Sequence, residues 1–148
     1  MLNIIRDYPI RKRDYNALHQ QKITANIDDV PGGGGASRSA ENAALRQLPK
    51  AEQREYDAVH LALQITAGLR DGKTRLSVAH YTLITGRYTI AGAAMRLGIP
   101  EEKARTYRWE FIMAVGYTYG FIEKDEYLGG IERRKNRYLH SQGQNDVL

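Results

Sequence analysis

The chain has 148 residues, which is enough for one domain with a buried core. Its 22 Lys and Arg residues exceed its 17 Asp and Glu residues, and the net charge of +5 favours polyanionic partners. Cysteine is absent, which excludes disulfides, a thiol nucleophile and a cysteine-based zinc site. Because no apolar run approaches membrane-spanning length and no signal-peptide layout opens the chain, we expect a soluble cytoplasmic protein with no membrane partner.

Residues 1–27 are predicted to form an N-terminal helical segment that is frayed over residues 1–8 and helical from Pro9. The helix is polar nearly all round, with a weak apolar stripe of Ile10, Tyr15 and Leu18, so it needs a partner surface. Residues 28–39, DDVPGGGGASRS, contain four consecutive glycines after a proline and are predicted to be a flexible linker.

Three helices are predicted between residues 39 and 85, at residues 39–48, 50–69 and 76–85. The second carries a wide apolar stripe that includes Tyr56, Val59, Leu63 and Thr66, and Gly86 closes the third. Between them, GLRDGKT at residues 68–74 ends in Gly-Lys-Thr, as a phosphate-binding loop does. It has only three residues between its glycines and follows a helix instead of a strand, so we reject that function.

The most informative stretch is residues 89–109, TIAGAAMRLGIPEEKARTYRW. Thr89 is suited to cap a short helix, and Gly98 follows its apolar stripe, where a chain leaving a helix often needs positive φ. Pro100 is pre-set for the first turn of a second helix. Small side chains at Ala93 and Ala94, matched by Ala104, allow the two helices to cross closely.

The second helix has two different faces. Tyr107 and Phe111 continue its inward face, while its outward face carries charged and hydroxyl side chains: Glu101, Glu102, Arg105 and Thr106, flanked by Lys103 and Arg108. This division is what a helix-turn-helix requires, since one face packs and the other enters the major groove. The alternative interpretation is an ordinary helical hairpin with a solvated charged face.

We therefore predict an all-α protein in which residues 40–122 form a helical DNA-binding domain with a helix-turn-helix at 89–109. Trp109, Ile112 and Met113 lie opposite Phe111 and need a second cover, from the N-terminal helices or a second subunit. Residues 123–148 are predicted to be a basic, mobile tail, in which a cluster around Arg133 either contacts phosphates or is solvated.

Nothing in the sequence indicates an enzyme. The four histidines follow no metal-ligand spacing, no serine lies in a nucleophile-elbow pattern, and the acidic residues do not pair as an acid and a base. We expect no catalytic residue, no metal and no cofactor.

Three features together resemble the RinA/ArpU-like late transcriptional regulators of Gram-positive bacteriophages. They are the Tyr8-Pro9 pair near the N-terminus, the glycine- and serine-bearing linker leading into SRSAENAALRQL, and the unit AHYTLITGRYTIAGAAMRLGIPEEKARTYRWEF. That unit is similar to the family's sigma-region-4-like helix-turn-helix. The chain departs from the family in having Pro100 where Ser or Thr is common and acidic residues at Glu101 and Glu102. The resemblance implies an activator of phage late genes that contacts the host RNA polymerase in the bacterial cytoplasm.

The function expected from the sequence is sequence-specific binding of double-stranded DNA to regulate transcription. Arg105 and Thr106 are predicted to contact base edges together with Glu102, while Lys103, Arg108 and Thr89 meet phosphates. Two copies are expected, since one short helix reads few bases. The alternatives are the small DNA-recognition subunit of a phage terminase, which forms larger rings, and a helical module that binds only protein.

Overall fold

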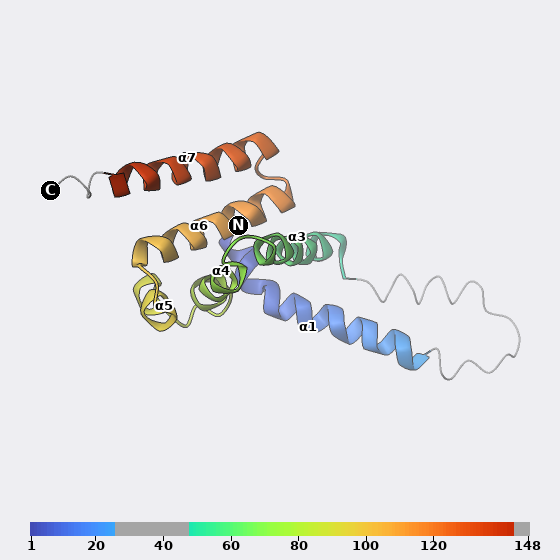
Figure 1. Cartoon of the computed structure of the whole chain (residues 1–148). Helices are drawn as coiled ribbons and strands as arrows, with labels where there is room; N and C mark the ends of the chain where they lie inside the picture. The colour runs from blue at the N-terminus through green and yellow to red at the C-terminus, as the bar shows by residue number, and fades with distance from the viewer. Residues whose placement is uncertain (26–47, 144–148) are drawn as a thin grey trace, which may run out of the picture.

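All regular secondary structure is helical in the computed structural model, which describes the backbone of residues 1–25 and 48–143 and the side chains of residues 1–20 and 48–133. This confirms the predicted all-α class. The helices are α1 (Leu2–Ala25), α3 (Lys50–Ala67), α4 (Gly72–Ala79), the π-helix η1 (His80–Ile84), α5 (Ile90–Leu97), α6 (Glu101–Tyr119) and α7 (Lys124–Gly143) (Figure 1). The predicted linker at 28–39 and nearly all of the predicted helix at 39–48 lie outside the described residues.

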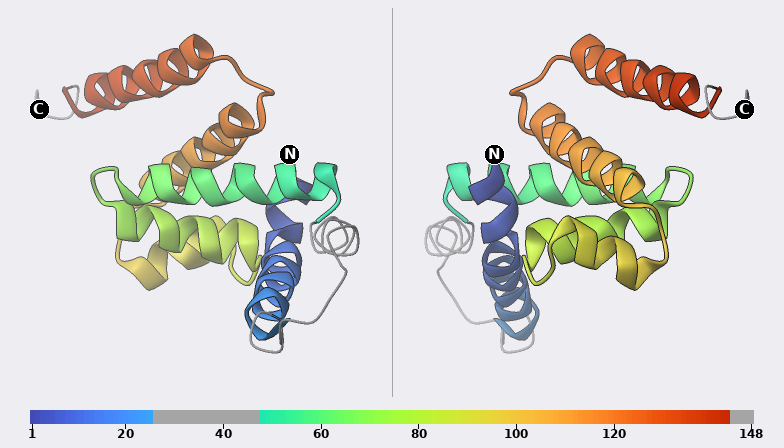
Figure 2. Two further views of the ribbon diagram at one scale, coloured as in Figure 1. Left: turned by 90° about the vertical axis from the view of Figure 1, so that its right-hand side faces the viewer. Right: turned by 90° about the vertical axis from the view of Figure 1, so that its left-hand side faces the viewer.

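The helix α6 is the element around which the others are arranged. It crosses α3 and contacts α4 and α5 near its start, while α7 packs on it and extends beyond the other helices (Figure 2). The segment formed by α4 and η1 runs alongside α3, and α1 contacts both α3 and η1. The beginning of α6 therefore lies beside α5, at the opposite end of the molecule from the start of α3 (Figure 1).

The main core joins α1, α3, η1 and α6. Its largest fully buried side chains include Phe111, Ile5, Val59 and Val115. A hydrogen bond of 2.8 Å from the Thr118 hydroxyl to the carbonyl of Ala58 adds a polar tie between α6 and α3.

The N-terminus is part of this core, so the expectation that residues 1–8 are frayed is wrong. The helix α1 begins at Leu2 and contains Pro9 in its interior. Ile4, Ile5 and Tyr8 have exposed fractions of 9%, 0% and 5% because they form one apolar face against α3 and α6. Proline is usually a helix-start signal, and here that signal was outweighed by burial of the preceding turn.

Further along α1, several tyrosines take part in the contacts between α1 and α3. The Tyr56 ring stacks on Tyr8 and Tyr15 at centroid distances of 5.6 and 4.5 Å, and Arg11 bridges Glu52 and Glu55 at 3.2 and 2.5 Å. The predicted stripe is thus correct for Tyr15 and Leu18, which pack against the core, whereas Ile10 is 54% exposed.

The turn between α3 and α4 brings two backbones unusually close. Asp71 has a φ of 60°, and α4 begins directly after it at Gly72, earlier than the predicted start at Leu76. The Gly-Lys-Thr sequence therefore forms the first turn of a helix. A Cβ at Gly72 would lie 2.3 Å from the carbonyl oxygen of Ala67, so only glycine fits this position.

The end of the same segment is a π-helix, which the sequence did not indicate. The backbone N–H and the hydroxyl of Thr85 both donate to the carbonyl of His80 at 2.9 Å, which closes the wider π turn. Gly86 then reverses the chain with a φ of 60°, as expected for the residue that closes this helix.

The C-terminal region is helical over Lys124–Gly143, a helix that was not predicted within the expected basic, mobile tail at 123–148, and residues 144–148 lie outside the described residues. Tyr127 is 7% exposed and its ring stacks on Tyr117 at 5.1 Å. A Cβ at Gly130 would lie 3.0 Å from the Trp109 ring, so α7 supplies a cover for the second face of α6 from within the same chain.

We predict that Gly72→Ala lowers the free energy of unfolding by about 1–3 kcal/mol, because the new methyl group would overlap the Ala67 carbonyl. Gly129→Ala is the control: this helical glycine has open space around its Cβ position, and the change should raise stability by up to about 1 kcal/mol. Urea unfolding followed by circular dichroism measures both. Equal stability of the Gly72→Ala variant and the parent would contradict the close approach.

Candidate nucleic-acid interface

The helices α4, α5 and α6 enclose a second, smaller core. Val78, Ala94, Ala104 and Tyr107 have exposed fractions of 0%, 3%, 0% and 4%, and Ile90, Leu97 and Ile99 pack around them. The predicted packing of small residues between α5 and α6 is therefore confirmed. This core fixes which face of α6 is turned inward.

The connection between α5 and α6 has the predicted local structure at Thr89 and Gly98, whereas Pro100 lies one residue before the helical turn in which it was predicted. The Thr89 hydroxyl accepts a hydrogen bond of 3.1 Å from the Gly92 N–H, and Gly98 ends α5 with a φ of 62°. Pro100 has extended backbone angles and directly precedes α6, so it is the capping residue and Glu101 is the first helical residue. The turn consists of residues 98–100.

The outward face of α6 is exposed at Glu101, Glu102 and Arg105. The Arg105 guanidinium donates to a Glu101 carboxylate oxygen at 2.5 and 3.2 Å and lies 3.8 Å from Glu102. The hydrogen bond to Glu101 raises the pKa of Arg105 above its ordinary value. Because the pair is open to water, its strength is small and the guanidinium can exchange partners.

The other predicted contact residues are distributed around this face. Lys103 turns toward α4, where its Nζ lies 3.1 Å from an Asp71 carboxylate oxygen, and the Thr106 hydroxyl donates to the Glu102 carbonyl at 3.0 Å. Arg108 is partly exposed and forms no hydrogen bond or ion pair with another side chain that the structure describes. Thr89 is exposed at the start of α5. The six predicted residues thus share one end of the molecule without forming a single cluster.

A polar cluster that the sequence did not reveal attaches the start of α4 to α6. The Tyr107 hydroxyl donates to Asp71 at 2.7 Å, and the Arg75 guanidinium lies 4.1 Å from the centre of the Tyr107 ring and pairs with Glu110. The hydrogen bonds from Tyr107 and Lys103 lower the pKa of Asp71. Burial, followed by the bond to Asp71, raises the pKa of Tyr107.

A further cation beside α5 was also missed. The Arg96 guanidinium lies 5.7 and 5.5 Å from the ring centres of Tyr81 and Tyr88, and hydrogen bonding to Tyr81 raises its pKa. Arg87 is exposed on the loop that leads into α5. Together they place positive charge next to Thr89, and only the folded chain brings Tyr81 and Arg96 together.

Metal sites and membrane-spanning helices were also sought in the part of the chain that the structure describes. Among the residues it describes, no group of three or more His, Cys, Asp or Glu side chains could hold a metal ion, and no helix is long and apolar enough to cross a membrane. No protein-family model, curated protein or solved structure matches the chain.

We predict that Asp71→Asn reduces the acid sensitivity of the fold. The lowered pKa of Asp71 means that its carboxylate stabilises the protein above the ordinary Asp pKa, and this contribution is lost as pH falls through the folded-state pKa. The urea midpoint of the variant should fall less steeply than that of the parent between about pH 6 and pH 2. Tyr107→Phe removes the hydrogen bond that contributes most to the lowered pKa of Asp71, so its urea midpoint should also fall less steeply with pH than that of the parent. Parallel curves for parent and Asp71→Asn would contradict the assignment.

We also predict that Ala104→Glu unfolds the α5–α6 pair, because the carboxylate would be buried against Ala94 and Val78. The expected loss is about 3 kcal/mol or more. The matched control is Ala91→Glu on the exposed side of α5, which should change stability by no more than about 0.5 kcal/mol. If the Ala104→Glu protein melts with the parent, the packing of the pair is not as described.

Proposed function

We propose that the chain binds double-stranded DNA through the exposed ends of α5 and α6, with the first half of α6 in the major groove. The observation that carries the proposal is the division of α6 into two faces. Ala104 and Tyr107 are buried against α4 and α5, whereas Arg105 and Glu102 face solvent from a helix whose position is fixed. A rigid helix with a polar outer face is the element that reads base edges in helix-turn-helix proteins.

Arg105 is the main candidate for base recognition. Its two donors match the O6 and N7 acceptors of guanine, and the same donors are occupied by Glu101 in the free protein. Binding would therefore exchange a weak, solvated ion pair for a bidentate contact. Thr106 lies one residue further along α6, and Glu102 can accept a hydrogen bond from a cytosine amino group.

Phosphate contacts would flank this reading surface. Lys103 and Arg108 lie beside it on α6, and Thr89, Arg87 and Arg96 provide polar and cationic groups at α5. Such contacts set the orientation of a protein on the duplex without reading its sequence. The net charge of +5 supports this electrostatic contribution.

The regulatory role rests on the resemblance to the RinA/ArpU-like family. From this resemblance we infer an activator of late phage genes that contacts the host RNA polymerase in the cytoplasm of the bacterial host. We expect two copies because one short helix reads few bases. This regulatory role goes further than DNA binding, and the position of the bound fragment in the phage genome tests it separately.

The first experiment is capture of phage genome fragments by the purified protein at about 150 mM salt, which suppresses non-specific binding. Enrichment of a fragment upstream of late genes supports the regulator, and enrichment at the packaging start supports the terminase subunit instead. If no fragment is enriched even at lower salt, the exposed face of α6 is only a solvated surface and the proposal is wrong.

On the enriched fragment, we predict that Arg105→Ala weakens binding by about 1–3 kcal/mol, with little change on random DNA of equal length. The control is Lys50→Ala, which removes the same charge at the start of α3 and should bind like the parent. Equal losses on both DNAs would reduce Arg105 to a phosphate contact.

A further inference from the structure

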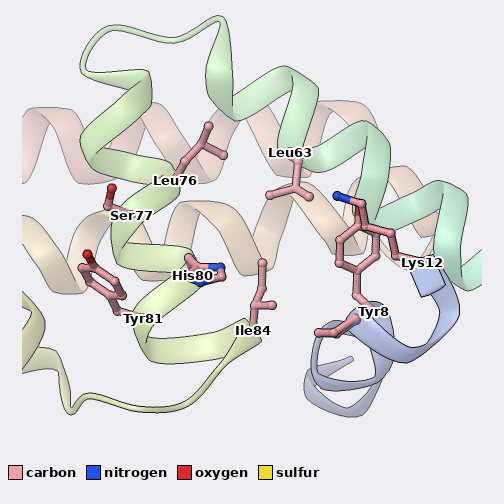
Figure 3. Close-up of a pocket in the computed structure, with 9 residues that line it drawn as sticks. Tyr8, Lys12, Leu63, Leu76, Ser77, His80, Tyr81 and Ile84 are labelled. Atoms are coloured by element: carbon pink, nitrogen blue, oxygen red, sulfur yellow. The ribbon is translucent and has the colours of Figure 1, made fainter. Parts of the chain in front are cut away.

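A groove separates α1 from the segment formed by α4 and η1. It has a volume of about 580 Å³, and its walls carry Tyr8 and Lys12 on one side and Leu76, His80 and Ile84 on the other. Leu63 of α3 lies between the two walls (Figure 3). This volume is within the range of sites for small ligands, which are commonly apolar with a few polar groups.

The groove is mostly apolar, and the charge on its lining is only positive. None of its lining residues is acidic, and Lys12 forms no hydrogen bond or ion pair with any side chain that the structure describes. Figure 3 shows the Lys12 ammonium directed across the groove toward Leu63, with the His80 imidazole on the opposite wall. An imidazole has an N–H donor in either tautomer. The polar groups available to a ligand therefore favour a negatively charged one.

The π-helix η1 forms part of the wall through His80 and Ile84. A π-helical turn is rare, is less stable than an α-helical turn, and occurs frequently at functional sites. Here it places His80 and Ile84 on the groove, while Tyr81 of the same π-helix contacts Arg96 of α5. The π turn and the positive charge are thus two independent observations that point to the same groove.

From these features we propose that the groove binds a small amphipathic carboxylate, such as a medium-chain fatty acid. Its apolar chain lies against Leu63, Leu76 and Ile84, and its carboxylate pairs with Lys12 and accepts from His80. The inference does not depend on DNA binding, although Tyr81, which lines the groove, also contacts Arg96 of the candidate nucleic-acid interface.

The test is a titration of the full chain with decanoate, followed by two-dimensional amide NMR and by calorimetry. We expect saturable binding with a dissociation constant of about 0.1–1 mM, and shifts concentrated in residues 8–12 and 76–85. Decanol, which has the same chain without the charge, should bind at least about tenfold more weakly, as expected for loss of one charge-assisted hydrogen bond.

Variants separate the charge from the groove. Lys12→Met keeps the length of the side chain and should weaken decanoate about tenfold without affecting decanol, whereas Lys124→Met on α7 should leave both unchanged. Leu63→Trp fills the groove and should abolish both. Absence of saturation, equal affinity for decanol, or shifts outside the groove would each overturn the proposal. Because the shift map is recorded on the parent chain, it tests the proposal even if Leu63→Trp fails to fold.

Discussion

The close crossing of α5 and α6 is the contact on which the rest of the candidate interface depends. Ala94 and Ala104 are nearly or fully buried where the helices meet, and a larger side chain at either position would separate the backbones. This crossing fixes the rotation of α6 about its axis. As a result, Arg105 faces solvent while Tyr107, two positions later, faces inward and reaches Asp71.

The same helix serves the interface and the main core at different points along its length. Its second half buries Phe111 and Val115 against α1, α3 and η1, and α7 covers Trp109 on another side. Anchoring of this kind gives the exposed first half a fixed position, which a helix needs if it is to present side chains to base edges. The bonds from Tyr107 and Lys103 to Asp71 extend the anchor to the start of α4.

The sequence predicted best those features whose signals are local. The cap at Thr89, the positive φ at Gly98 and the inward alanines all follow from residues within one turn of each other, and all are confirmed. Besides local differences such as the earlier start of α4, the sequence missed contacts between distant residues. Burial of Ile5 depends on α3 and α6, α7 lies against the Trp109 ring at Gly130, and Asp71 meets Tyr107 across 36 positions. The resemblance to a regulator family, the DNA contacts and the dimer stay predictions.

The most direct test of the central claim is an amide NMR map of the full chain with and without a duplex that it captures. The account predicts the largest shift changes in residues 89–109, with Arg96, Arg105 and Thr106 among them and the start of α3 unaffected. Changes concentrated on α3 or α7, with the first half of α6 unperturbed, would contradict the assignment of this face to DNA.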